Sequence, residues 1–200
     1  MKRQLKEKIM IDLFKIQAIK FGSFKLKSGL MSPVYIDLRV LISYPQVLKK
    51  VVVFYEEILK ELKFDRLVAV PYTAIPIATA ISLKINKPLI YTRKEIKDYG
   101  IKRPVEGECK KGEKMVLIDD MITTGGSKLE VVSLLTNLGL KVNQVVVLID
   151  REQGGKEELE KNKIKLYSAF SLKDWIKFLF KKRLINQNKY QEVINYLKTK

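Results

Sequence analysis

Short apolar runs alternate with helical patterns along the middle of this chain, and the alternation limits the folds that it can adopt. The runs that read as buried strands cover residues 66–70, 88–93, 115–119 and 144–150. The segments with apolar residues at helical spacing cover residues 45–62, 74–85 and 127–139. Strands joined through helices form right-handed crossovers, so we predict an α/β fold with a mostly parallel central sheet covered by flanking helices.

The two ends of the chain add smaller elements to this core. Residues 2–20 have helical spacing, and the segments 21–29 and 32–39 resemble short strands across a turn, which predicts a small N-terminal hood. Residues 164–170 read as a further strand, followed by two amphipathic helices. We expect one domain over 1–200, with helix and hood elements at 1–44, the α/β core at 45–170 and C-terminal helices at 171–200.

Composition excludes several kinds of chemistry. The chain has no histidine and one cysteine, Cys109, which excludes imidazole catalysis, an internal disulfide and a cysteine-based metal site. No apolar stretch is long enough to span a membrane, and charges interrupt the N-terminal segment, so we expect neither a span nor a signal peptide. These features predict a cytoplasmic protein.

The positive charge of the chain invites a nucleic-acid interpretation. Lysine and arginine total 39 against 22 acidic residues, a net charge of +17. The lysines occur in nearly every segment, whereas nucleic-acid-binding proteins usually concentrate arginine in a stripe among aromatic residues. The distribution therefore favours a lysine-rich solvated surface, and we expect neither a nucleic-acid nor a membrane partner.

The segment VLIDDMITTGGS (116–127) carries the strongest chemical signal. An apolar strand ends here in two acids, and small and hydroxylated residues follow at once. In parallel sheets, ligands bind at the carboxyl ends of the strands, where a glycine turn and a helix N-terminus attract phosphate. Carboxylates for hydroxyls beside a phosphate turn suit a ribose 5-phosphate. Simple helix capping would explain one acid, but not this whole series.

This segment resembles the motif of type I phosphoribosyltransferases that binds 5-phosphoribosyl 1-diphosphate (PRPP). Four further segments are similar to orotate phosphoribosyltransferases, especially to the corresponding domain of bifunctional UMP synthase. These segments are FGSFKLKSGLMSPVYIDLR (21–39), VPYTAIPIAT (70–79), RKEIKDYGIKRPVEG (93–107) and LIDREQGG (148–155). The resemblance implies the type I phosphoribosyltransferase fold.

The resemblance also implies a reaction. A glycosyltransferase of this kind moves ribose 5-phosphate from PRPP to orotate and releases orotidine 5′-phosphate and diphosphate, a step of de novo UMP biosynthesis. It uses Mg²⁺, held mainly through PRPP and diphosphate, so no direct protein ligand of the metal is assigned. An oxocarbenium-like transition state asks for positioning and charge stabilisation, which fits a chain without histidine.

The PRPP site implied by the motif follows residue by residue. Its residues are Asp119, Asp120, Met121, Ile122, Thr123, Thr124, Gly125, Gly126 and Ser127. The two acids would hold the ribose hydroxyls, and residues 123–127 the 5-phosphate. Tyr72 and Thr73 correspond to the diphosphate loop, where the family often has a cis peptide. Bacterial relatives commonly carry lysine at the position of Thr73, so one cationic contact is missing there.

The orotate site and the lid are implied in the same way. Arg151 would grip the orotate carboxylate, Lys27 would contact substrate from the hood, and Tyr35 and Ile36 would flank the ring. The family's lid corresponds to the segment from Arg93. Its implied substrate contacts are Arg93, Lys94, Lys97 and Tyr99, of which Arg93 and Lys97 join Asp119 and Asp120 as catalytic residues. Tyr99 stands where bacterial lids often have histidine.

In the family this lid enters the active site of the neighbouring subunit, so we expect a homodimer. Two other functions stay open at this point: a PRPP-sensing regulator that binds nucleic acid, and a phosphoribosyltransferase for a purine base. The bifunctional relatives continue into a decarboxylase domain that has no counterpart in this sequence. The resemblance therefore implies a separate orotidine 5′-phosphate decarboxylase, with a complex between the two chains as an open alternative.

Overall fold

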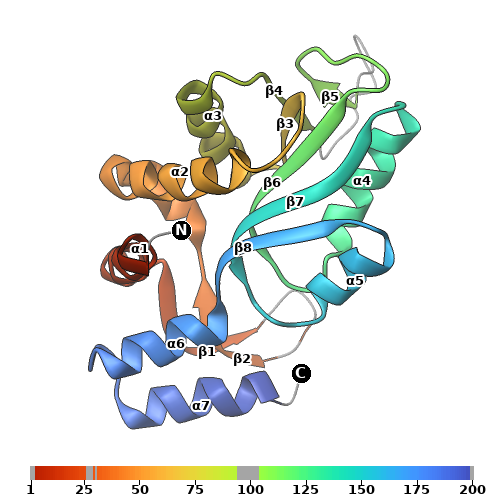
Figure 1. Cartoon of the computed structure of the whole chain (residues 1–200). Coiled ribbons are helices and arrows are strands. Elements are labelled where there is room, and N and C mark those ends of the chain that lie inside the picture. Colours follow the sequence, from red (N-terminus) through yellow and green to blue (C-terminus); the bar gives the residue numbers. More distant parts are fainter. Residues whose placement is uncertain (1–2, 26–28, 30, 94–103, 199–200) are drawn as a thin grey trace.

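The computed structural model describes residues 3–25, 29, 31–93 and 104–198. In this part of the chain, a six-stranded sheet lies between two layers of helices, and a two-stranded hood stands beside it (Figure 1). The predicted α/β fold with a mostly parallel sheet and an N-terminal hood is confirmed.

The helices and strands follow the predicted order closely. Before the central sheet come α1 (Arg3–Lys15), β1 (Ile19–Lys25), β2 (Met31–Ile36) and the 3-10 helix η1 (Leu38–Ser43). The first half of the core contains α2 (Pro45–Leu59), β3 (Arg66–Ala69), α3 (Ala74–Ile85), β4 (Leu89–Thr92) and β5 (Val105–Glu106). The second half contains β6 (Lys114–Ile122), α4 (Gly126–Asn137), β7 (Lys141–Asp150), α5 (Gly155–Lys161) and β8 (Lys165–Ser171). The chain then forms α6 (Leu172–Lys181) and α7 (Gln187–Lys198).

The central sheet has the strand order β5-β4-β3-β6-β7-β8, and all neighbours are parallel except β4 and β5. Successive residues of β6 face opposite layers. Val116 and Ile118 belong to the core under α1, α2, α3 and α6, whereas Met115 and Leu117 belong to the core under α4 and α5. Burial on both faces explains why the strands read as continuous apolar runs.

The C-terminal helices close the layer that contains the hood. Trp175 on α6 is fully buried, and its indole Nε1 donates to the carbonyl of Met10 on α1 at 3.0 Å. Helix α7 contacts both α6 and strand β2 (Figure 1). None of the helices among the described residues has the length and hydrophobicity that crossing a bilayer requires.

Four elements differ from the sequence-based prediction. The 3-10 helix η1 begins at Leu38, inside the segment 32–39 that reads as a strand. Strand β5 has two residues, pairs antiparallel with β4 and lies in a segment that reads as polar loop. Helix α5, GKEELEK, buries only Gly155 and Leu159, so its sequence has no apolar stripe. Strand β6 was predicted to end at the two acids. It continues to Ile122, because β7 pairs with it as far as Asp150.

Candidate functional site

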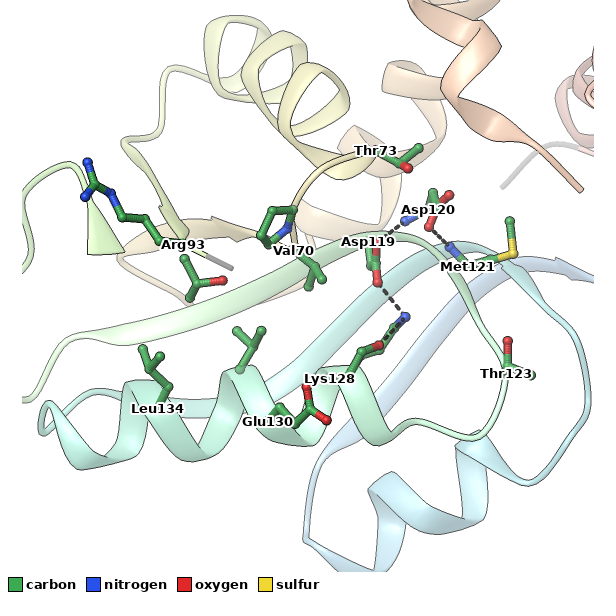
Figure 2. A pocket seen from close by; sticks show the side chains of 14 residues that line it. Val70, Thr73, Arg93, Asp119, Asp120, Met121, Thr123, Lys128, Glu130 and Leu134 are labelled. Atoms are coloured by element: carbon green, nitrogen blue, oxygen red, sulfur yellow. Dashed lines mark hydrogen bonds and ion pairs between the residues drawn. The ribbon is translucent and has the colours of Figure 1, made fainter. Parts of the chain in front are cut away.

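The candidate site lies between β3 and β6, where the connections from neighbouring strands run in opposite directions along the sheet. Strand β3 connects through α3 to β4 on one side, and β6 connects through α4 to β7 on the other, so β3 and β6 flank a topological switch point. Crevices at such points are the usual ligand sites of open α/β sheets. A pocket of about 490 Å³ opens here. Its lining residues are Val70, Pro71, Thr73, Thr92, Arg93, Asp119, Asp120, Met121, Thr123, Ser127, Lys128, Glu130, Val131 and Leu134 (Figure 2).

The two acids reach the pocket because β6 is longer than its neighbour. Pairing between β3 and β6 ends at Ala69 and Ile118, so the next residues of β6 stand beyond the end of β3. Both carboxylates line the pocket, as Figure 2 shows for Asp119 and Asp120. The structure therefore brings these acids together with Thr73, Thr123 and Ser127 in one pocket.

Asp119 is held from three directions. Its Oδ1 accepts from the amide of Asp120 at 2.8 Å, its Oδ2 lies 2.5 Å from Lys128 Nζ, and its carbonyl accepts from the Tyr55 hydroxyl at 2.6 Å. Asp120 accepts from the amide of Met121 at 2.8 Å. Burial, with the neighbouring Asp119 charge, raises the pKa of Asp120 to about 8. Asp120 therefore keeps its proton to a higher pH than an ordinary aspartate does.

Lys128 is a pocket residue that the sequence analysis missed. It is only 6% exposed, and it lies on α4 one residue after the predicted phosphate turn. Val131 and Leu135 are the other buried residues of this helix, at the third and seventh positions after Lys128. A lysine on the apolar stripe of a helix is the signal that could have identified it, because a buried lysine needs a partner.

The turn after β6 is shaped by close backbone contacts. Gly125 has a φ of +88° and precedes the first residue of α4, while Thr123 and Ser127 line the pocket. Ile122 is fully buried in the core and does not line the pocket. Thr124 is exposed, and an added Cβ at Gly126 would meet nothing within 4 Å.

Gly155 at the start of α5 supports this turn from behind. A Cβ built at Gly155 would lie 2.6 Å from Ile122 Cγ1 and 2.6 Å from the carbonyl oxygen of Thr123. Such distances are too short for carbon, so a side chain here would displace the turn. The sequence analysis did not single out Gly155. The residues that it contacts in space, Ile122 and Thr123, lie more than 30 positions earlier in the chain, and no local pattern reveals such a contact.

We expect Gly155→Ala to destabilise the protein by about 1–3 kcal/mol, the usual effect of overpacking a rigid site. Gly126→Ala is the matched control, since the same added methyl group meets open space and should change the free energy of unfolding by less than about 0.5 kcal/mol. Urea unfolding of the two variants measures both values. Equal stability of the two variants would refute the supporting role of Gly155.

The predicted diphosphate loop lies on the opposite side of the pocket from the turn. The peptide bond between Pro71 and Tyr72 is cis, and Thr73 precedes α3 and lines the pocket. The side chain of Tyr72 is 63% exposed. Backbone groups of this loop are therefore near the space that the two carboxylates face.

Arg151 is a buried cation with unused hydrogen-bond donors. It follows β7 directly, and its amide donates to the carbonyl of Ile122 at 3.0 Å. The side chain is 8% exposed, and among the described residues its Nε and Nη2 have no hydrogen-bond partner. Burial lowers the pKa of this guanidinium from its ordinary value. A planar donor fork in this state is suited to an anionic partner such as a carboxylate.

The predicted hood contacts are separate from the pocket at the strand edge. Tyr35 stacks obliquely on Phe24 at 5.5 Å between ring centroids, and its hydroxyl accepts from Arg39 Nη2 at 3.1 Å. Ile36 is buried in the core. Adjacent strand residues point to opposite faces, so the side chains of Tyr35 and Ile36 leave β2 on different sides. Their contact with the orotate ring stays a prediction. Lys27 lies outside the described residues.

Most of the predicted lid also lies outside the described residues, including Lys94, Lys97 and Tyr99. Arg93 immediately precedes this segment and lines the pocket. Its guanidinium forms an ion pair with Glu106 on β5 of the same chain and points away from the two acids (Figure 2). In this arrangement Arg93 contacts its own subunit.

The described residues contain no cluster of three or more histidine, cysteine or acidic side chains that could hold a metal ion by themselves. Asp119 is already paired with Lys128, and Asp120 and Glu130 are the other carboxylates that line the pocket. Magnesium usually keeps several waters and binds through one or two carboxylates together with substrate phosphates. The donor set therefore fits an ion carried largely by a phosphorylated ligand.

Asp120 should give the protein an unusual pH dependence of stability. An aspartate in an unfolded chain titrates near pH 4, whereas the pKa of Asp120 is raised to about 8 in the fold. Between about pH 4 and pH 8 the folded state binds the additional proton, so this group lowers the free energy of unfolding as pH rises. The Asp120→Asn variant has no carboxyl group at this position, so nothing titrates there. The variant should gain stability relative to the wild type across this range in urea unfolding, and a constant difference would contradict the assignment.

Comparison with known proteins gives consistent matches. The phosphoribosyl transferase domain family matches residues 43–181. The uridine 5′-monophosphate synthase of Bos taurus is 41% identical over 191 residues, which are 94% of this chain and 40% of that protein. The orotate phosphoribosyltransferase of Pyrococcus furiosus is 38% identical over 82% of this chain and 91% of its own length.

Solved structures of UMP synthases and orotate phosphoribosyltransferases also match this chain. The UMP synthase of Leishmania donovani matches 98% of this chain and 42% of its own chain, with a TM-score of 0.91 and 38% identity. The orotate phosphoribosyltransferase of Aeropyrum pernix matches 86% of this chain and 98% of its own, with a TM-score of 0.75 and 31% identity. The chain thus spans about two fifths of the bifunctional relatives and nearly the whole of the shorter ones.

Proposed function

The chain belongs to the phosphoribosyltransferase family, and we propose that it transfers ribose 5-phosphate from PRPP to orotate in UMP biosynthesis. One observation carries the proposal. Asp119, Asp120 and the two ends of the turn at 123–127 line the same pocket at the switch point. Acids for a diol beside a turn for a phosphate match the two ends of the ribose 5-phosphate group.

The orotate half of the proposal rests on Arg151. Among the residues that the structure describes, two donors of this buried guanidinium have no partner, which favours a substrate with a carboxylate. Orotate has a carboxylate and a purine base lacks one. The relatives reported above at 31–41% identity are named orotate phosphoribosyltransferases or UMP synthases, which also supports orotate. Neither a purine-base enzyme nor a nucleic-acid-binding regulator has a comparable observation in its favour.

In the proposed reaction, the bond from ribose C1 to the diphosphate oxygen breaks, N1 of orotate bonds to C1, and the proton of N1 leaves to diphosphate or water. The acids at 119 and 120 orient the ribose, residues 123–127 hold its 5-phosphate, and the backbone at Tyr72 and Thr73 faces the leaving diphosphate. Arg151 fixes orotate by its carboxylate. Lys94, Lys97 and Tyr99, with Arg93, would cover the diphosphate and exclude water that could capture the ribosyl cation.

Magnesium is the proposed cofactor. It would neutralise the diphosphate group of PRPP when bound, and Asp120 is the carboxylate in the pocket best placed to contribute to its hydration shell. The remaining contacts of the ion would come from substrate oxygens and water. This agrees with a donor set that lacks a protein cage for a metal ion in the described part of the chain.

We place the proposed dimer contact on the exposed apolar surface of η1, α2 and α3. Large hydrophobic side chains that are partly or largely exposed there are Ile42, Tyr44, Val53 and Leu83, and Leu83 is 81% exposed. Patches of this kind commonly mark protein interfaces. Light scattering should give the mass of two chains for the wild type and of one chain for Leu83→Glu. An unchanged mass in the variant would place the contact elsewhere.

We also propose a cytoplasmic setting, which suits a chain whose single cysteine cannot form an internal disulfide. Two relatives are more than twice the length of the region that matches this chain, and we propose that orotidine 5′-phosphate passes to a decarboxylase that binds this chain. Co-purification with that enzyme would detect such a complex.

The direct test is an assay with PRPP, Mg²⁺ and one base at a time. Orotate absorbance should fall with time in the ultraviolet, and diphosphate should be released in equal amount. Adenine and hypoxanthine should remain unchanged in parallel reactions. Consumption of a purine in place of orotate would replace the proposal with a purine-base enzyme.

A further inference from the structure

Lys128 has no role in the proposed reaction as described so far, although it lines the same pocket. Its side chain is 8% exposed, and it lies in the first turns of α4 between the two acids and the phosphate turn (Figure 2). Its Nζ is 2.5 Å from Asp119 Oδ2 and 3.4 Å from Ser127 Oγ. The ammonium group is thus fixed between a residue of the ribose side and a residue of the phosphate side.

The contacts of Asp119 and Asp120 differ because of this lysine. Both oxygens of Asp119 have a partner within the protein, since Oδ1 accepts from the Asp120 amide and Oδ2 pairs with Lys128. Asp120 accepts from the amide of Met121 through Oδ1, and its side chain points into the pocket. Asp120 is therefore better placed than Asp119 to accept hydrogen bonds from a diol.

We infer that Lys128 is the built-in counter-ion of the PRPP site: it neutralises Asp119, holds it as a positioning residue and leaves Asp120 to bind the ribose hydroxyls. This inference rests on the proposed function. PRPP carries several negative charges, and an unpaired buried carboxylate beside it would repel the substrate. A fixed cation between the acids and the turn removes that repulsion before the substrate arrives.

A purely structural lysine would be a poor choice at this position. Apolar side chains occupy the other buried positions of the stripe, Val131 and Leu135, and an apolar residue at 128 could pack with them without the cost of burying a charge. The ion pair is instead placed where a polyanionic substrate is proposed to bind. The inference therefore predicts an effect on PRPP binding that is separate from any effect on folding.

The test uses calorimetric titration of PRPP with Mg²⁺ into the wild type and four variant proteins. Lys128→Met should weaken PRPP binding about tenfold or more, because it leaves Asp119 buried and unpaired. Lys128→Arg should stay within about threefold of the wild type, since it keeps the charge. Lys60→Met is the matched control: Lys60 pairs with Glu56 at 2.9 Å on α2, away from the pocket, and its loss should not change binding.

The fourth variant protein is the double variant Asp119→Asn with Lys128→Met, which removes both charges of the pair. It should recover most of the PRPP affinity lost in Lys128→Met, and it decides the matter if the single variant fails to fold. In steady-state kinetics the single variant should raise KM for PRPP much more than KM for orotate, a split that a general loss of stability would not produce.

Two results would overturn the inference: wild-type affinity in Lys128→Met, or a double variant that binds PRPP no better than the single variant. In both cases the wild type would still bind PRPP and convert orotate. Failure of the proposed function is recognised differently, because the wild type itself would then show no PRPP binding or no turnover of orotate.

Discussion

Arg151→Met is expected to lower kcat/KM for orotate by about 100-fold or more, equivalent to the 2–5 kcal/mol typical of truncating one partner of a buried charged pair. The guanidinium is buried, follows β7 directly and keeps Nε and Nη2 without partners among the described residues. A carboxylate that accepts from this fork would be left without its donors. Initial rates at varied orotate concentration measure the effect.

Two controls separate recognition of orotate from damage to the fold. PRPP affinity should change little in Arg151→Met, since Arg151 is assigned to the base and not to the sugar. The free variant should be no less stable than the wild type, because the substitution removes a buried cation whose Nε and Nη2 have no hydrogen-bond partner in the described part of the chain. Arg151→Lys should fall between the two proteins, because it keeps the charge and loses the fork. An unchanged KM and kcat in Arg151→Met would remove the basis for orotate as the substrate.

Lys97→Ala is expected to lower kcat by about 10²–10³-fold, the effect of removing one preorganised donor from a developing negative charge. The expectation comes from the similarity of the segment 93–107 to the family's lid, because Lys97 itself lies outside the described residues. Single-turnover measurements isolate the chemical step from product release. PRPP affinity should fall much less than kcat, since the lysine acts mainly as diphosphate departs.

A shared lid predicts that inactive variants complement each other. Mixing equal amounts of Lys97→Ala and Asp120→Asn should restore about one quarter of wild-type activity, because half of the dimers are hybrids with one intact site each. Mixing Lys97→Ala with Tyr99→Ala is the control, since every lid in that mixture carries a defect. Equal recovery in both mixtures, or none in the first, would contradict a lid shared between subunits.

The elements that sequence analysis predicted correctly have local signals. Strand β3 and helix α3 read correctly because apolar runs and helical spacing are properties of neighbouring residues. Strand β5 did not, because two residues cannot display a period and its pairing with β4 bridges a long segment. Helix α5 is held by Leu159 and by the contact of Gly155 with the turn, neither of which forms a pattern in sequence.

The candidate site divides in the same way. The acids, the glycine turn and Arg151 were predicted because they stand in contiguous segments at strand ends, and the structure brings the first two to one pocket. The burial of Lys128 and its pairing with Asp119 depend on how α4 lies on β6, which only the fold determines. Residues from α1, α2 and α6 share one core cluster, so we propose that 1–200 folds as one domain.

The central claim is that PRPP binds at the carboxyl edge of the sheet through Asp120 and the turn at 123–127. Calorimetric titration of PRPP in the presence of Mg²⁺ tests it most directly. Above about pH 8, where Asp120 carries its charge, the wild type should bind with a stoichiometry of one per chain. Asp120→Asn should bind at least about tenfold more weakly there, as expected for loss of a charged acceptor to two hydroxyls. Absence of binding by the wild type, or equal affinity in the variant, would contradict the claim.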